Sequence, residues 1–263
     1  MGIRRDATSA PDGGSAAARP AVGPGPVNRI PAVLRSWLEG LARGAFELNR
    51  RNLLELAAAS APGRFCDLGC DDGAWTLQVA RAARAVEVAG IEIVSERAHQ
   101  ARTRGVQAVV ADLNQELPFA GESFDLVHAN QVIEHVSDVD RFMSEVTRVL
   151  RPGGTSLIST ENGSSWHNVG AAAAGWQIFS LTNLSGRVGG IGNPFALHRG
   201  TTGHLQSWTH KTIFNYRGLL EFHEVHGLRP VRVLGAGYHP LPPALGRFDR
   251  RHAHVLAVMA IKD

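Results

Sequence analysis

The sequence predicts an α/β protein built on a doubly wound, mostly parallel sheet of seven strands. Strand-like and helix-like segments alternate from residue 64 to residue 160, the pattern of parallel strands joined by right-handed helical crossovers. A glycine-containing turn follows the first strand, and acidic residues stand at the ends of the first three. Two further strand-like segments, 231–234 and 253–261, follow and bring the number of predicted strands to seven.

The chain of 263 residues is long enough for one large domain with an ample core. Its first 29 residues are mainly Ala, Gly, Pro, Ser and Arg, which predicts a disordered leader without the apolar core of a signal peptide. Residues 30–263 then form the domain. The longest later apolar run, 169–179, is well short of the roughly 20 residues that span a bilayer. We therefore expect a cytoplasmic protein with no integral membrane segment.

Charge and cysteine content exclude some partners. The formal net charge is +3, and the basic residues are scattered, so a nucleic-acid partner is not expected. Cys66 and Cys70 are the only cysteines and flank the glycine turn. We expect both to be free and buried, because a disulfide would strain the turn and no second pair exists for zinc. The oligomeric state stays open, with a homodimer as one option.

The segment before the first strand reads as helical. Apolar residues recur at helical spacing from residue 30 to residue 59. Gly40 and Gly44 interrupt the pattern and predict two helices with a break between them.

The glycine turn after residues 64–68 is the most informative stretch. Asp67 ends the strand, and Gly69 and Gly73 bracket Asp71 and Asp72. Glycine permits close approach of a ligand to bare backbone. Three carboxylates would repel a pyrophosphate, and the Gly-x-Gly-x-x-Gly spacing of dinucleotide sites is missing, so a nicotinamide dehydrogenase is disfavoured. The turn suits a cationic ligand.

This turn resembles motif I of class I S-adenosylmethionine-dependent methyltransferases, usually Asp/Glu-x-Gly-x-Gly-x-Gly, with Asp71 in place of the middle glycine. Two further stretches, 117–127 (LPFAGESFDLV) and 150–154 (LRPGG), resemble the small-molecule branch typified by ubiquinone and menaquinone methyltransferases. The resemblance implies a Rossmann-like fold that closes with a C-terminal antiparallel hairpin, S-adenosyl-L-methionine as cofactor and a small-molecule acceptor. It also implies that Asp67, Gly69, Asp71 and Gly73 bind the cofactor.

Residues at the following strand ends complete the expected cofactor site. Glu92 ends the second strand, where a carboxylate can accept both ribose hydroxyls, and Ile93 would lie against the adenine. The resemblance implies that Asp112 takes the adenine amino group, that the backbone of Leu113 meets the ring edge, and that Asn130 lies beside the sulfonium. Two alternatives stay open: Glu92 is simply solvated, and Asp112 forms an Asx turn or helix cap.

His135 is the first candidate for a base. A helix expected over 131–150 places Gln131, Glu134 and His135 on one face. In quinone O-methyltransferases the comparable stretch is Glu-x-x-Glu-His and can hold a divalent cation. Gln131 replaces the first Glu here, and a neutral amide binds a hard cation less well, so no metal is expected. The alternative is that Glu134 and His135 only orient the helix and loop.

The segment 160–210 is too long for an ordinary loop and is predicted to be an inserted lid on the acceptor side. His204 is a second candidate base, in a stretch (204–209) that resembles a His-x-x-x-aromatic-Thr stretch of bacterial relatives. Aromatic and imidazole side chains suit a polar ring such as a sugar or a phenol. The expected substrate contacts are Glu161, Trp166, His167, Trp208 and, from a later loop, Tyr238.

The function predicted from the resemblance is small-molecule methylation, with O-methylation of a polar or glycan-type hydroxyl preferred. N- or C-methylation of a small metabolite is the nearest alternative. A non-catalytic binding module of the same fold is a third, supported only by Asp71 and Gln131.

Overall fold

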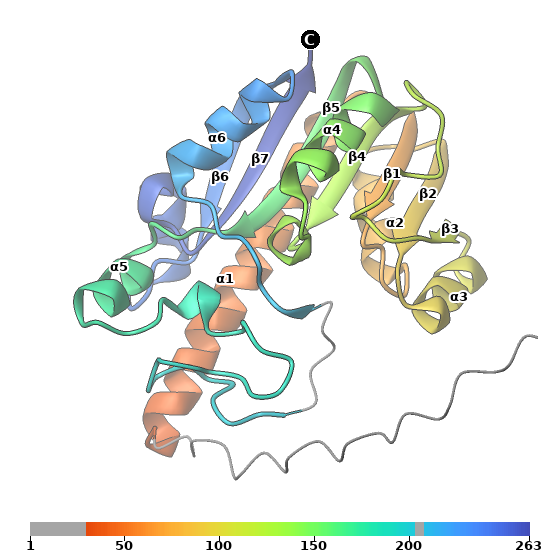
Figure 1. Ribbon diagram of the computed structural model, residues 1–263. Helices are drawn as coiled ribbons and strands as arrows, with labels where there is room; N and C mark the ends of the chain where they lie inside the picture. Colours follow the sequence, from red (N-terminus) through yellow and green to blue (C-terminus); the bar gives the residue numbers. More distant parts are fainter. Residues whose placement is uncertain (1–29, 203–207) are drawn as a thin grey trace, which may run out of the picture.

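The computed structural model describes residues 30–202 and 208–263 (Figure 1). The leader predicted at residues 1–29 and the candidate base His204 lie outside the described residues. A seven-stranded sheet has the order β3-β2-β1-β4-β5-β7-β6. The strands are β1 (Arg64–Leu68), β2 (Glu87–Glu92), β3 (Gln107–Val110), β4 (Phe124–Asn130), β5 (Leu150–Glu161), β6 (Leu228–Ala236) and β7 (Val255–Lys262).

The predicted mixture of parallel and antiparallel pairing is confirmed. Strands β1 to β5 pair in parallel, whereas β7 pairs antiparallel with both β5 and β6. Glu161 at the end of β5 lies opposite Val255 at the start of β7. The carboxyl ends of β1 to β5 therefore share one edge of the sheet with the start of β7. Asp67, Glu92, Asp112 and Asn130 lie at or just beyond strand ends on this edge.

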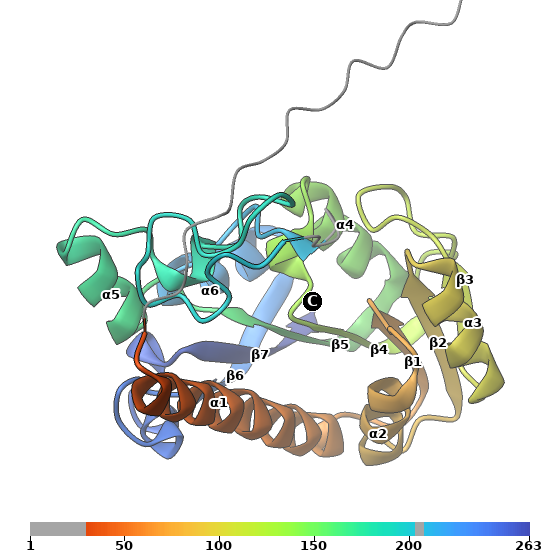
Figure 2. The ribbon, with the colours of Figure 1, turned by 90° about the horizontal axis from the view of Figure 1, so that it is seen from below.

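Helices cover both faces of the sheet, with α1 and α2 on one and α4 and α6 on the other (Figure 2). None of the helices in the described residues is long and apolar enough to cross a membrane. The α-helices are α1 (Ala32–Ala59), α2 (Ala74–Ala82), α3 (Ser95–Thr103), α4 (Val139–Val149), α5 (Trp166–Ala173) and α6 (Tyr216–Val225). Short 3-10 helices are η1 (Ile133–His135), η2 (Phe179–Leu181), η4 (Pro243–Arg247) and η5 (Arg250–His252).

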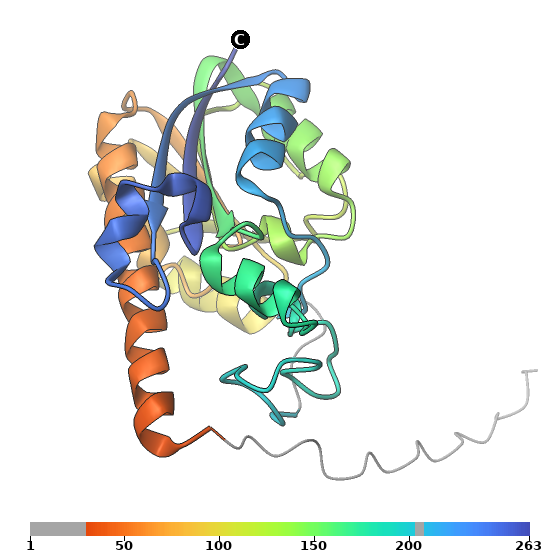
Figure 3. The same ribbon diagram turned by 90° about the vertical axis from the view of Figure 1, so that its left-hand side faces the viewer.

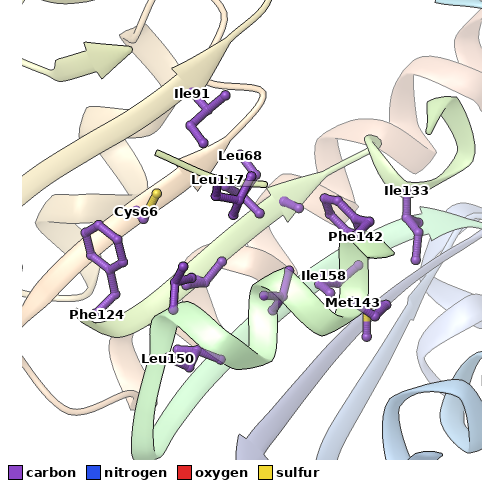
Figure 4. Packing of buried hydrophobic residues seen from close by; sticks show 14 of the residues in the cluster. Cys66, Leu68, Ile91, Leu117, Phe124, Ile133, Phe142, Met143, Leu150 and Ile158 are labelled. Atoms are coloured by element: carbon purple, nitrogen blue, oxygen red, sulfur yellow. The ribbon is translucent and has the colours of Figure 1, made fainter. Parts of the chain in front are cut away.

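The core consists of layers on the two faces of the sheet. Alternation along β4 sends Leu126 toward α1 and α2 and Val127 toward α4, since successive strand residues face opposite sides. Phe142 and Met143 of α4 pack on the second layer, which also contains Ile158 of β5 (Figure 4). These layers hold the carboxyl edge of the sheet rigid.

The prediction of two helices over residues 30–59 is wrong. Helix α1 is one continuous helix of 28 residues. Gly40 and Gly44 cost roughly 1 kcal/mol each relative to Ala, which packing of the buried Leu53 and Leu56 outweighs. At Gly44 the missing side chain leaves room for Pro243, which a Cβ would approach to 3.0 Å. The N-terminal half of α1 extends past the sheet (Figure 3).

The helix predicted over 131–150 is also wrong at its start. Gln131 has a left-handed backbone (φ 55°), η1 follows, and α4 begins only at Val139. Asp138 defines this start by accepting a hydrogen bond from Arg141 N at 2.9 Å. Boundaries moved elsewhere too: β5 begins at Leu150 and not after the Pro-Gly-Gly, and α6 begins at Tyr216 and not at Lys211.

Candidate functional site

The glycine turn between β1 and α2 is held by backbone geometry. Gly69 and Gly73 have φ of 82° and 81°, the left-handed region that glycine enters without strain. A Cβ at Gly69 would lie 2.8 Å from Val132 Cγ2. Asp71 stands at the position of the middle glycine and also has a positive φ of 47°. Aspartate tolerates this conformation better than most residues, so the turn keeps its shape despite the replacement.

Asp67 lies beneath the turn and not on its open side. Its side chain is only 2% exposed. One carboxylate oxygen accepts from Thr76 Oγ1 at 2.6 Å and the other from His128 Nδ1 at 2.7 Å, where His128 is fully buried. This differs from the expected rim carboxylate: Asp67 joins β1, α2 and β4 below the turn, and its contact with a ligand stays a prediction.

Glu92 occupies the rim position that the sequence predicts. Its two carboxylate oxygens accept from Asp71 N at 3.0 Å and Val94 N at 2.9 Å, which ties the end of β2 to the glycine turn. Ile93 follows with about half of its side chain exposed. The carboxylate is half-buried and stands beside the bare turn, where ribose hydroxyls could replace or join these amides.

Asp112 lies just beyond β3, the strand next to β2 in the sheet. Its Oδ1 accepts from both the backbone N (2.9 Å) and Nδ2 (2.7 Å) of Asn114, so the Asx-turn alternative describes the backbone here. Leu113 packs against the main core cluster. This Asx turn fixes the carboxyl group of Asp112 at the edge of the sheet. It uses only Oδ1, so a ligand could still bind the second oxygen, Oδ2.

Asn130 ends β4 in a network of polar side chains. Its Oδ1 accepts from Asn49 Nδ2 of α1 at 3.0 Å and from Ser159 Oγ of β5 at 2.7 Å. The next residue, Gln131, has its Nε2 buried without a partner. A buried amide donor left unpaired is costly, which marks this position as a place for a ligand oxygen or carboxylate.

Glu134, His135 and His210 form a separate cluster. Each has one atom that could ligate a metal ion, and these three atoms lie within 4.8 Å of one another. Burial raises the pKa of Glu134 to about 8, and Glu161 contributes in the same direction. Burial and the neighbouring His210 lower the pKa of His135 to about 4. His135 Nδ1 donates to Thr209 O (3.2 Å), so the neutral ring has its free electron pair on Nε2.

A cavity of about 220 Å³ lies between the N-terminal half of α1 and residues 161–198. Two of the predicted substrate contacts, Glu161 and His167, line it. Arg35 Nη2 donates to Leu197 O at 3.3 Å and links the two walls. The other lining residues are mostly apolar or imidazole: Leu38, Ala42, Phe46, Phe179, Thr182, Phe195, Ala196, Leu197, His198, His239 and His254.

The remaining predicted substrate residues do not line this cavity. Trp166 is 45% exposed, donates from Nε1 to Tyr238 Oη (2.8 Å) and stacks on His252 at 4.1 Å. Tyr238 in turn donates to Asp249 Oδ2 at 2.6 Å. Trp208 is 53% exposed, and its carbonyl accepts from Asn183. Their role as substrate contacts stays a prediction.

Sequence reasoning named His239 as a possible residue of the acceptor pocket, and it does line the cavity. It missed His254 in the cavity, and His128 and Asn49 at the cofactor side. No local motif marks these three residues, which come from the residue before β7, the middle of β4 and helix α1. The one available sequence signal was the position of His254 at the start of a predicted strand.

Comparison with known proteins finds similarity to methyltransferases. Residues 66–158 match the family model described as a methyltransferase domain. A ubiquinone biosynthesis O-methyltransferase of Brucella melitensis is 35% identical over 102 residues, covering 38% of this chain and 41% of that protein. The chain thus spans less than half the length of this curated relative.

Two solved structures share the fold over most of the chain. A methyltransferase from Thermotoga maritima aligns with a TM-score of 0.54 and 17% identity, covering 88% of this chain and 98% of that one. A methyltransferase from Mesorhizobium loti gives 0.53 and 21%, covering 84% and 99%. At these identities the likeness shows the fold alone.

Proposed function

We propose that the chain carries a class I S-adenosylmethionine-dependent methyltransferase domain and transfers the methyl group of this cofactor to a small-molecule acceptor. We further propose that the acceptor atom is a hydroxyl oxygen on a polar or glycan-type ring. The O-methyltransferase relative supports the oxygen. The cavity beside the carboxyl edge, with aromatic and imidazole walls, supports a ring.

The observation that carries the proposal is the arrangement of Glu92 and Asp112 beside the bare glycine turn, at the ends of adjacent parallel strands. Ligands of doubly wound sheets bind at this edge. Glu92 would hold the ribose and Asp112 the adenine, while the orphaned Gln131 Nε2 fits a ligand oxygen beside β4. The residues present therefore fit the cofactor, which supplies an electrophilic methyl group on sulfur.

The transfer needs alignment and one proton acceptor. The acceptor oxygen would bond to the methyl carbon supplied by the cofactor as the carbon–sulfur bond breaks, with the electron pair of that bond left on sulfur. The hydroxyl proton must leave to a base. We assign this role to His135, because its lowered pKa keeps the ring neutral at physiological pH and its Nε2 carries the electron pair. His204 stays a second candidate.

We propose that the segment 160–210 covers the acceptor, since its residues 161–198 supply one wall of the cavity. Exclusion of water there would favour transfer to the acceptor over side reactions. The wall is held at its base: Asn168 Nδ2 donates to Ser180 Oγ at 2.8 Å within the segment.

Isothermal titration of the full chain with S-adenosylmethionine and S-adenosylhomocysteine tests the cofactor claim. We expect heat with both and none with NADH. Absence of heat with either sulfur ligand would end the proposal. Turnover is then assayed on matched phenol, sugar, amine and activated-carbon acceptors, because methylated amine or carbon products would replace O-methylation by the alternatives. Cofactor binding with no product on any acceptor would favour the non-catalytic module.

His135→Gln tests the base. A lost general base should slow turnover about 100-fold or more while the affinity for S-adenosylhomocysteine stays unchanged. His99→Gln, on the exposed side of α3, is the matched control. Unchanged turnover in His135→Gln would remove this assignment.

A further inference from the structure

Three histidine rings meet at the cavity in a nearly equilateral arrangement. The centroid distances are 4.9 Å for His167 to His239, 4.5 Å for His167 to His254 and 4.7 Å for His239 to His254. One nitrogen from each ring lies within 4.8 Å of the others. The rings come from α5, from the loop after β6 and from the residue before β7, so their meeting is a property of the fold.

Each ring has a buried nitrogen without a hydrogen-bond partner: His167 Nδ1, His239 Nε2 and His254 Nδ1. The side chain of His254 is only 7% exposed. An unpaired buried polar atom costs roughly 1–3 kcal/mol, so three in one place need an explanation. Burial lowers the pKa of all three rings, that of His239 to about 4. Neutral imidazole is the form that ligates metals.

We propose that His167, His239 and His254 bind a divalent transition-metal ion of the zinc type. Imidazole ligands suit Zn²⁺ and other transition metals such as copper, iron and nickel. Three protein ligands and an open position are the usual composition of a catalytic zinc site. Zn–N bonds of about 2.0–2.1 Å need ligand nitrogens roughly 3.3 Å apart, so modest ring rotations would close the site.

The surroundings match those of metal-bound histidines, whose second nitrogen usually donates to a carboxylate or a backbone carbonyl. His254 Nε2 lies 4.0 Å from Glu161 Oε1. The backbone of Leu41 acts on the His239 ring by raising its pKa, against the lowering by burial. Glu161 stands two residues beyond Ser159, on the same side of β5, and Ser159 bonds Asn130. The ion would thus sit beside the predicted sulfonium position.

The open position would face the cavity, whose other walls are largely apolar. An ion there would lower the pKa of a coordinated hydroxyl and orient it. This deepens the proposed function and rests on it: the acceptor would be a ring with an oxygen able to ligate the metal, such as a catechol or a vicinal diol. The metal site itself does not depend on methyl transfer.

The test uses the full chain, stripped with a chelator and dialysed against chelator-buffered Zn²⁺, with bound zinc measured by elemental analysis. We expect one zinc per chain. Co²⁺ in its place should give the visible absorption of a four- or five-coordinate ion. His239→Gln and His254→Gln should each weaken zinc binding roughly 100-fold or more, since loss of an outer-shell partner alone costs 10–100-fold.

Two variants act as controls: His99→Gln should bind zinc as the wild type does, and His135→Gln tests the neighbouring cluster. Zinc should raise the unfolding temperature of the wild type and of His99→Gln but not of His239→Gln, a comparison that holds even if a variant is less stable. No zinc bound to the wild type, or zinc lost only in His135→Gln, would overturn the site. S-adenosylhomocysteine binding, measured in parallel, reports separately on the proposed function.

Discussion

The two ends of the carboxyl edge treat their polar groups in opposite ways. At the β1–β2 end, Asp67 and Glu92 have both carboxylate oxygens in hydrogen bonds. At the β5–β7 end, Glu134 and three histidines keep buried atoms without partners. Buried polar groups are normally satisfied, so the two carboxylates of the first end need no further partner, although the neighbouring His128 Nε2 is unpaired. The second end concentrates its unpaired atoms in four side chains, three of which form the proposed metal site.

The largest expected effect tests this unsatisfied end. Burial raises the pKa of Glu134 from 4.5 to about 8, so the folded protein binds this proton more tightly than the unfolded chain does. The associated stability is complete below pH 4.5 and is lost as the pH rises through about 8. A shift of this size corresponds to on the order of 5 kcal/mol.

Glu134→Gln keeps a neutral group that can bond Thr160, so urea denaturation should show it to be more stable than the wild type above pH 8 and little changed near pH 4.5. Glu47→Gln, exposed on α1, should follow the wild type at both values. Parallel stability curves for Glu134→Gln and the wild type would mean that the carboxyl is not held protonated.

At the satisfied end, Asp67→Ala should be destabilising at neutral pH. It leaves His128 buried without its partner and removes the carboxylate acceptor of Thr76, and each lost buried partner costs about 1–3 kcal/mol. Urea denaturation measures the loss. Asp71→Asn, on the exposed part of the same turn, should stay within about 0.5 kcal/mol. Equal stability of Asp67→Ala and the wild type would contradict the bracing role of this carboxylate.

Glu92→Ala should weaken binding of S-adenosylhomocysteine by about 1–3 kcal/mol, from the loss of charge-assisted hydrogen bonds. Calorimetric titration gives the affinity. Glu87→Ala, at the opposite end of β2, removes an exposed partner of Arg64 and should leave the affinity unchanged. If both variants bind equally well, Glu92 does not hold the ribose.

The smallest effect concerns the unusual residue of the turn. Asp71→Gly relieves a left-handed backbone but increases the freedom of the unfolded chain and removes the exposed pair with Arg97. These contributions oppose each other, so stability should change by less than about 1 kcal/mol and cofactor affinity should persist. A large gain in affinity would instead show that Asp71 impairs the site and would favour the binding-module alternative.

The satisfied end is also the end that the sequence predicts well. Strand, glycine turn and acid lie within a few residues of each other, so local pattern determines Gly69, Gly73 and Glu92. Even there, the pattern gave no sign that Asp67 turns inward, because its partner His128 is 61 residues away.

The side chains at the β5–β7 end could not be predicted from local pattern in the same way. The helix expected through Gln131 fails because the chain takes a left-handed turn at that residue, which no propensity rule assigns to glutamine. His239 and His254 meet His167 only through the antiparallel pairing of β6, β7 and β5. Such long-range packing leaves no periodic signal in the sequence.

The continuity of α1 has a practical consequence for altering the protein. One rigid rod is anchored in the core by Leu53 and Leu56 and, several turns earlier, supplies Leu38 and Phe46 to the cavity wall. Its inner half packs in the core and its outer half shapes the cavity in which we propose that the acceptor binds. Laboratory evolution of acceptor range should therefore diversify the outer turns of this rod and leave the inner turns untouched.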